Sequence, residues 1–187
     1  MSQNARLEEI RWHGRGGQGA VLGASILGSA AALYEGKYAV SFPSFGAERR
    51  GAPVQAFTRI AGHVIRSRSQ IYHPTKIIVL DDTLLDVVNI TDGAQAGASI
   101  FINTRKPASE LSLPDYLNVI TLDASAIARD IIGVAIVNTT MLGALAGATT
   151  LVSLDSIKQA IANALPKKIA ERNIAAAEAA YQKVKGK

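Results

Sequence analysis

A glycine-rich stretch near the N-terminus holds the residues with the clearest capacity for binding chemistry: residues 12–19 read WHGRGGQG. Gly14, Gly16 and Gly19 satisfy the spacing G-x-G-x-x-G. Glycine can take positive φ, and its missing Cβ lets another backbone or a phosphate approach closely. A helix that begins here would present free N–H groups and the positive end of its dipole. The stretch is therefore a candidate site for an anion.

A dinucleotide site would need one further part, a carboxylate about 20 residues downstream that binds a ribose hydroxyl. Residues 40–45, around the end of the next extended segment, contain no carboxylate, and Glu35 comes too early. This missing part argues against an NAD site. The other interpretation of the glycines is structural, because they also let a helix pack closely on a strand.

A second segment with chemical content is the loop at residues 44–51, SFGAERRG, which lies in a region interrupted by Pro43 and Pro53. It combines an aromatic residue, a carboxylate and two adjacent arginines in a chain that has few aromatics. Such a mixture is typical of a contact surface. The alternative is a solvent-exposed turn on which Glu48 forms a weak ion pair with Arg49 or Arg50.

The rest of the chain offers no catalytic set. It has no cysteine, which excludes disulfides, a thiolate nucleophile and a cysteine-ligated iron–sulfur cluster within this chain. Its three histidines do not have the spacing of metal ligands. Asp81 and Asp82 are adjacent, so a strand would send them to opposite faces, which suits paired acid–base work poorly.

The glycine stretch must be positioned by a strand before it and by a helix over residues 18–34 after it. Apolar runs predict further strands at 38–41, 76–80, 98–103 and 117–122. Two-residue periodicity at 54–60, a turn and then 64–69 predict an antiparallel hairpin, with Arg66 and Arg68 on one solvated face.

Helical periodicity follows at 83–88, 123–132, 138–148, 154–165 and 167–184, with Ser153 as an N-cap and Pro166 as a stop. This alternation predicts an α/β fold: a Rossmann-like three-layer domain with a mostly parallel sheet, an antiparallel hairpin addition and a C-terminal helix.

The composition is that of one globular domain, which we expect to span residues 1–187. Of the 187 residues, 48% are hydrophobic and 19% are charged, which argues against disorder. The net charge of +5 favours acidic or phosphate-bearing partners, but the charges are spread out, which argues against nucleic acid. Apolar stretches are interrupted before they could span a bilayer, so we expect a cytoplasmic protein without a membrane partner.

Five features in order along nearly the whole chain resemble the gamma subunit of the 2-oxoacid:ferredoxin oxidoreductases. They are HGRGGQG at 13–19, FPSFGAERRGAPV at 42–54, IRSRSQI at 65–71, Asp81, and NTTMLGA at 138–144. The loop at 42–54 looks closest to the pyruvate and 2-oxoisovalerate branch. A lone glycine fingerprint would be a weak signal, whereas this ordered series is a strong one.

The resemblance implies a share in oxidative decarboxylation, in which a 2-oxoacid, expected to be pyruvate, reacts with coenzyme A to give acyl-CoA, CO2 and reduced ferredoxin. It implies alpha, beta and ferredoxin-like delta subunits as partners, and ferredoxin or another acceptor reached through the complex. Thiamine diphosphate, Mg²⁺ and iron–sulfur clusters are expected on those partners, and no cofactor on this chain alone.

The resemblance also implies that the glycine stretch and the loop face the partner subunits near the active site. The expected contact residues are Gly14, Arg15, Gly16, Gly17, Gln18, Gly19, Phe45, Gly46, Glu48, Arg49, Arg50 and Gly51. The arginines could instead bind coenzyme A phosphates, since guanidinium groups suit phosphate. Two other functions stay open: a free-standing Rossmann-like nucleotide-binding protein and a purely structural subunit.

Overall fold

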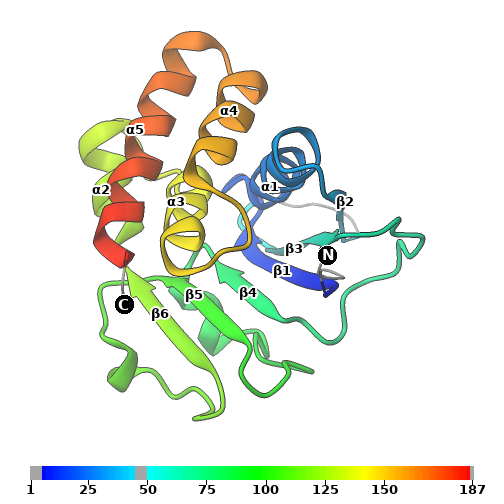
Figure 1. The fold of residues 1–187 in the computed structure, drawn as a ribbon. Helices are drawn as coiled ribbons and strands as arrows, with labels where there is room; N and C mark the ends of the chain where they lie inside the picture. Colours follow the sequence, from blue (N-terminus) through cyan, green and yellow to red (C-terminus); the bar gives the residue numbers. More distant parts are fainter. Residues whose placement is uncertain (1–5, 45–49, 186–187) are drawn as a thin grey trace.

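A six-stranded mixed sheet forms the centre of the computed structural model, which describes residues 6–44 and 50–185 (Figure 1). The strand order is β2-β3-β1-β4-β5-β6. The strands are β1 (Glu8–Arg15), β2 (Tyr38–Pro43), β3 (Pro53–Ala61), β4 (Lys76–Val79), β5 (Ser99–Asn103) and β6 (Asn118–Leu122).

Parallel pairing joins β1, β4, β5 and β6, while β3 lies antiparallel between β1 and β2. The sheet is therefore mostly parallel, as predicted. The chain leaves β1 toward the β2 edge and later returns to the other side of β1 as β4. In open α/β sheets, ligands and functional groups gather at the carboxyl ends of the strands where the order reverses in this way.

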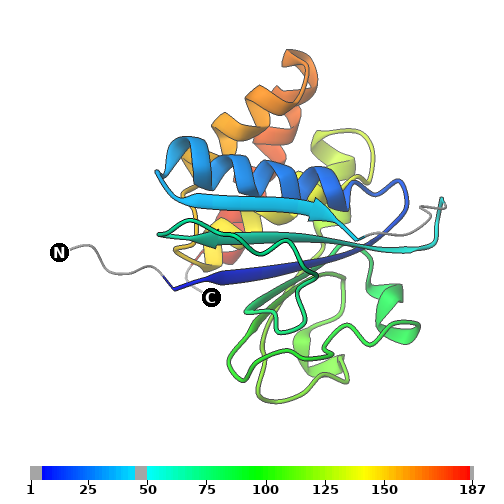
Figure 2. The same cartoon turned by 90° about the vertical axis from the view of Figure 1, so that its right-hand side faces the viewer.

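The helices and turns form a layer on each face of the sheet, which confirms the three-layer α/β prediction (Figure 2). The α-helices share one face: α1 (Ala20–Tyr34), α2 (Ala124–Ile131), α3 (Asn138–Ala148), α4 (Leu154–Ala164) and α5 (Lys167–Val184). Two short 3-10 helices, η1 (Asp82–Asp86) and η2 (Ala108–Glu110), cover the other face together with loops. Among the described residues, no helix combines the length and the apolar character needed to cross a bilayer.

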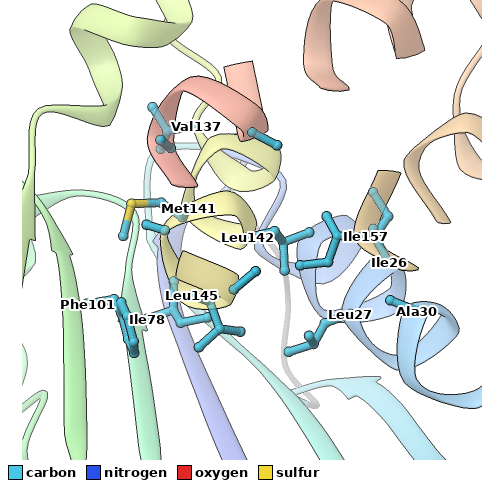
Figure 3. Close-up of a cluster of buried hydrophobic side chains, with 14 of the residues drawn as sticks. Ile26, Leu27, Ala30, Ile78, Phe101, Val137, Met141, Leu142, Leu145 and Ile157 are labelled. Atoms are coloured by element: carbon cyan, nitrogen blue, oxygen red, sulfur yellow. The ribbon is translucent and has the colours of Figure 1, made fainter. Parts of the chain in front are cut away.

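Side chains along the central strands point alternately to the two faces of the sheet and so contribute to the hydrophobic core on each face. Ile78 of β4 and Phe101 of β5 point to the α-helical layer, while Ile77 and Val79 pack against the 3-10 layer. Figure 3 shows that Leu142 and neighbouring side chains of α3 lie between these strand residues and helices α1 and α4. Helix α3 is therefore the centre of the larger core.

Helices α3 and α5 pack with their backbones in close approach. A Cβ on Gly143 would overlap the carbonyl oxygen of Ala177, and one on Gly147 would collide with the backbone at Tyr181. Thr139 near the start of α3 donates to Asn173 near the start of α5, at 2.6 Å. The two helices thus run in the same direction, and their N-terminal ends lie at the same edge of the molecule.

The end of α1 is fixed to the start of α4 by Glu35. Its carboxylate accepts hydrogen bonds from the Ser153 backbone N–H (2.6 Å), the Ser156 hydroxyl (2.9 Å) and the Lys37 ammonium group (3.2 Å). Burial raises the pKa of Glu35, but these hydrogen bonds outweigh burial and lower it from 4.5 to about 2. The predicted N-cap is confirmed, because the Ser153 hydroxyl accepts from the Ser156 N–H.

The predicted pairing of 54–60 with 64–69 is wrong. Strand β3 pairs with β1 and β2, and within the described part of the chain residues 64–69 form no strand. Strand β3 lies between β1 and β2, so it has no free edge with which residues 64–69 could pair. The buried Arg59 instead fixes the end of this loop: its guanidinium group donates to the carbonyls of Ser69 (2.7 Å) and Gln70 (3.2 Å) and pairs with Glu9 (2.8 Å).

We expect Gly143→Ala to lower the free energy of unfolding by about 1 to 3 kcal/mol, because α3 and α5 must separate to admit the methyl group. Gly28→Ala in α1 is the matched control, since its Cβ would clash with the Ser41 hydroxyl rather than with backbone, and this side chain can move at the cost of its hydrogen bond to the Ala24 carbonyl. Thermal and urea unfolding of both variants would measure the difference. Equal losses in the two variants would contradict the close packing of α3 and α5.

Candidate functional site

The glycine stretch forms a tight turn between β1 and α1, as predicted. Gly17 and Gly19 have φ angles of 95° and 77°, which lie in the left-handed region that favours glycine. A Cβ on Gly19 would also collide with the side-chain amide of Asn138. These two positions therefore require glycine for backbone conformation, and Gly19 also for space.

Three side chains lock this turn to the end of β4. The Gln18 amide accepts from the Arg15 N–H at 2.8 Å and donates to the Asp81 carboxylate at 2.8 Å. The Arg15 guanidinium group pairs with the same Asp81 oxygen at 3.2 Å. We call this set of contacts among Arg15, Gln18 and Asp81 the Asp81 junction.

The Asp81 carboxylate has all its close partners within the chain. Its second oxygen accepts from the backbone N–H (3.1 Å) and the hydroxyl (2.6 Å) of Thr83, which begins the 3-10 turn η1. Partial burial raises the pKa of Asp81, but the hydrogen bonds from Thr83 and Gln18 and the charge of Arg15 outweigh burial, so the pKa lies below its ordinary value. The junction is therefore charged at neutral pH.

Asp82 points to a different partner, the Thr104 hydroxyl, at 2.6 Å. The two adjacent aspartates thus do not form an acid–base pair, which agrees with the sequence argument. The sequence singled out Asp81 only as part of the resemblance and did not predict that it lies beside the glycine turn. A carboxylate at this turn was expected about 20 residues downstream, but β3 lies between β1 and β2, so the parallel neighbour of β1 is β4 and the carboxylate is Asp81.

The glycine turn also contacts the C-terminal end of the loop predicted at residues 44–51. The Gly16 N–H donates to the Ala52 carbonyl at 2.9 Å, and the Gly51 N–H donates to the Gly16 carbonyl at 3.1 Å. The Arg15 guanidinium group donates to the Gly51 carbonyl at 3.1 Å, and Arg50 beside it is exposed. The structure therefore brings the glycine turn and residues 50–52 together. The other predicted loop residues, Phe45, Gly46, Glu48 and Arg49, lie outside the described residues.

Asn138 connects the turn to α3. Its side-chain N–H donates to the Gly19 carbonyl at 3.1 Å, and its side-chain oxygen accepts from the Thr139 N–H at 2.9 Å. The residue is buried. From the sequence, Asn138 stood out only as part of the NTTMLGA segment of the resemblance; the structure places it in contact with Gly19, far away in the chain.

His13, which precedes the turn, is buried and neutral. Burial and the positive charge of Arg11 lower the pKa of His13 from 6.5 to about 3. The Arg11 guanidinium group donates to Nε2 of His13 at 3.1 Å and to the carbonyls of Ile90 (2.8 Å) and Asp92 (2.7 Å). Because the ring is buried within the fold, His13 supports the structure rather than proton transfer to a substrate.

A polar cavity of about 540 Å³ lies next to the Asp81 junction, at the carboxyl ends of β4 and β5. Gln18 and Asp81 of the junction line this cavity, and so do the exposed arginines Arg105 and Arg129. This is the edge where open α/β sheets hold ligands. The mixed charges suit a polar group that offers both acceptors and donors.

The chain does not fit the redox or metal groups of the family that it resembles. It has no cysteine for an iron–sulfur cluster. In the described ranges 6–44 and 50–185, no group of three His, Cys, Asp or Glu side chains could hold a metal ion. Its site is thus a set of locked backbone segments with exposed arginines.

Comparison with known proteins identifies the family. The family model for pyruvate ferredoxin/flavodoxin oxidoreductase matches residues 9–183. The chain belongs to this family. It is 51% identical over 176 residues to pyruvate synthase subunit PorC of Methanocaldococcus jannaschii, covering 94% of this chain and 96% of that protein.

Two further family members agree. The pyruvate/ketoisovalerate oxidoreductases common subunit gamma of Thermococcus kodakarensis is 49% identical over 180 residues, covering 94% of this chain and 96% of that protein. The crystal structure of pyruvate oxidoreductase subunit PORC from Thermotoga maritima aligns with a TM-score of 0.81 and 35% identity, covering 95% of this chain and 96% of that chain. The chain is thus a gamma-type, non-autonomous subunit of a 2-oxoacid oxidoreductase in this family, and the resemblance read from the sequence is confirmed.

We expect Asp81→Asn to loosen the Asp81 junction. It removes the negative charge paired with Arg15, and the new amide N–H group would face the N–H groups of Arg15 and Gln18, which also donate. Hydrogen exchange at residues 14–19 and 50–52 should become faster, and the free energy of unfolding should fall by about 1 to 3 kcal/mol. Asp86→Asn, at an exposed position in the same 3-10 helix, is the control. Exchange unchanged from the native chain would show that the junction does not hold the turn.

We expect His13 to make stability depend on pH. The unfolded chain takes up a proton below pH 6.5, whereas the fold does not until about pH 3, so stability is lost as pH falls through this window, by about 1.4 kcal/mol per unit. His13→Gln, whose oxygen can still accept from Arg11, should remove this slope. Urea unfolding between pH 7.5 and 5 would measure it, with exposed His63→Gln as the control; an unchanged slope in His13→Gln would refute the assignment.

Proposed function

We propose that this chain completes the active site of a pyruvate-oxidising member of the family by presenting the glycine turn and residues 50–52 to a partner subunit. The complex would convert the 2-oxoacid and coenzyme A to acyl-CoA and CO2 and pass a pair of electrons to ferredoxin. The pyruvate assignment is supported by the names of the relatives at about half identity, one of which also names ketoisovalerate. Residues 1–187 act in this proposal as one domain.

One observation carries the proposal: hydrogen bonds join two segments far apart in the sequence into a single surface. Reciprocal backbone hydrogen bonds join Gly16 to Gly51 and Ala52, and the Asp81 junction fixes the other side of the turn. Such preorganisation is what a surface needs if it is to position groups of another chain, because little ordering is left to occur on binding.

Partner chains hold the redox and metal groups in this proposal. Thiamine diphosphate, Mg²⁺ and iron–sulfur clusters would lie on the partner alpha, beta and ferredoxin-like delta subunits, where they supply decarboxylation and electron transfer. The lack of cysteine in this chain supports that division. This chain contributes backbone donors, arginines and shape.

Charge pairing favours partner contact over direct binding of coenzyme A. The Arg15 guanidinium group is already shared among Asp81, Gly51 and Thr83, and the Asp81 carboxylate next to the turn would repel a phosphate there. Arg50, by contrast, is exposed at the edge of the same surface. Arg50 is therefore the described residue that we assign to a carboxylate of the partner, and coenzyme A phosphates are its alternative ligand.

The test is Arg50→Glu in the complete complex, with Lys183→Glu as the control. Lys183 is exposed near the C-terminal end of α5, away from the α3 end that carries Asn138. We expect Arg50→Glu to weaken assembly or oxoacid-dependent dye reduction by about tenfold or more, while Lys183→Glu retains both.

Measuring assembly and the KM for coenzyme A separately distinguishes partner contact from coenzyme A binding. A higher KM for coenzyme A with normal assembly would assign Arg50 to coenzyme A, and weaker assembly would assign it to the partner. Normal assembly, KM and kcat in Arg50→Glu would refute the active-site role and leave a purely structural subunit.

A further inference from the structure

A second surface, separate from the Asp81 junction, is an apolar groove of about 540 Å³ between the N-terminal ends of α1, α3 and α5. The loop from α2 to α3 lines its remaining side through Val134 and Ile136. The apolar lining residues are Leu22, Ile132, Val134, Ile136, Leu165 and Ile169.

The groove is part of an exposed apolar surface. Val134 and Ile169 are each 50% exposed, and Ile136 is 45% exposed. Helix α1 extends this surface, because none of its 15 residues is charged and Val21 beside the groove is 37% exposed. Contiguous apolar patches on a folded protein mark interaction sites. A surface that extends beyond the cavity fits a macromolecular segment better than a small ligand.

The groove is also electrostatically one-sided. Lys168 and Arg172 are its charged lining residues, and no carboxylate lines it among the described residues. A second copy of this chain bound about a two-fold axis through the groove would bring these cations toward one another without a counter-charge. The complementary occupant therefore carries apolar side chains and at least one carboxylate, which a different chain can supply.

The groove adjoins the glycine turn. Thr139 and Asn173 line it and bond to each other at 2.6 Å, which joins α3 to α5 there. Asn138 lines the same groove and donates to the Gly19 carbonyl. A partner seated in the groove would therefore lie next to the surface assigned above to the active site.

We propose that this groove docks a segment of a partner subunit of the same oxidoreductase, with apolar side chains in the groove and a carboxylate on Lys168 and Arg172. The inference rests on the proposed function only in that it takes this chain to assemble with partner subunits. It adds a second contact that anchors the chain, while the turn and residues 50–52 face the active site.

The test measures binding of this chain to the purified remainder of its complex. Ile169→Glu should weaken the affinity by about tenfold to a hundredfold, because it places a charge in the apolar contact. Lys168→Glu should also weaken it and should reduce its dependence on salt. Val87→Glu, which changes a side chain 62% exposed on the other face of the sheet, should bind as the native chain does.

A second readout does not depend on weakened binding. Since the chain has no cysteine, Ile169→Cys gives it a single thiol for an environment-sensitive fluorophore. The emission should shift to the blue when the complex assembles, and the same label at Val87→Cys should not shift.

Three results would overturn the inference: native affinity in Ile169→Glu with no emission shift, unaltered affinity and salt dependence in Lys168→Glu, or a dimer of the isolated chain that Ile169→Glu dissociates. Arg50→Glu in the same assay separates the two proposals. If Arg50→Glu impairs the complex and the groove variants do not, only the groove inference fails.

Discussion

The Asp81 carboxylate is the contact on which the functional edge of this fold depends. It joins the turn after β1 to the end of β4, because both Gln18 and Arg15 donate to it while Thr83 fixes it from the other side. The same Arg15 reaches the Gly51 carbonyl, so one ion pair also supports the end of the distant loop. A charged acceptor makes stronger hydrogen bonds than a neutral one, which suits a junction that holds separate backbone segments together.

Small residues decide where the helices place their ends. Gly143 and Gly147 let α3 lie against α5, and Gly23 lets α1 lie on Trp12. Close packing in the same direction brings the N-terminal ends of α3 and α5 to the edge that holds the glycine turn. The candidate active-site surface and the apolar groove are therefore neighbours for one geometric reason.

The buried arginines stabilise the fold, whereas the exposed arginines form part of the candidate contact surface. Arg11 and Arg59 are buried and donate to carbonyls of loops, so they shape the layer opposite the α-helices. Arg50, Arg105 and Arg129 are exposed around the junction and its polar cavity. A subunit without cysteine, and without a group of metal ligands in its described part, can still serve a redox enzyme if it presents such a surface to a partner.

The sequence by itself determined the local features: the strand, glycine turn and helix, the Ser153 cap, the helical spans and, through its ordered motifs, the family. All of these except the family depend on residues within a few positions of one another, and the family depends on the order of several such local motifs. Tertiary structure alone decided which strands pair, that Asp81 lies beside the turn, that Asn138 contacts Gly19, and that 64–69 is a loop held by Arg59. Side-chain periodicity defines which face of a strand is buried, but it does not define which strand pairs with it. Many pairings bury the same face, and the packing of the whole core selects one pairing among them.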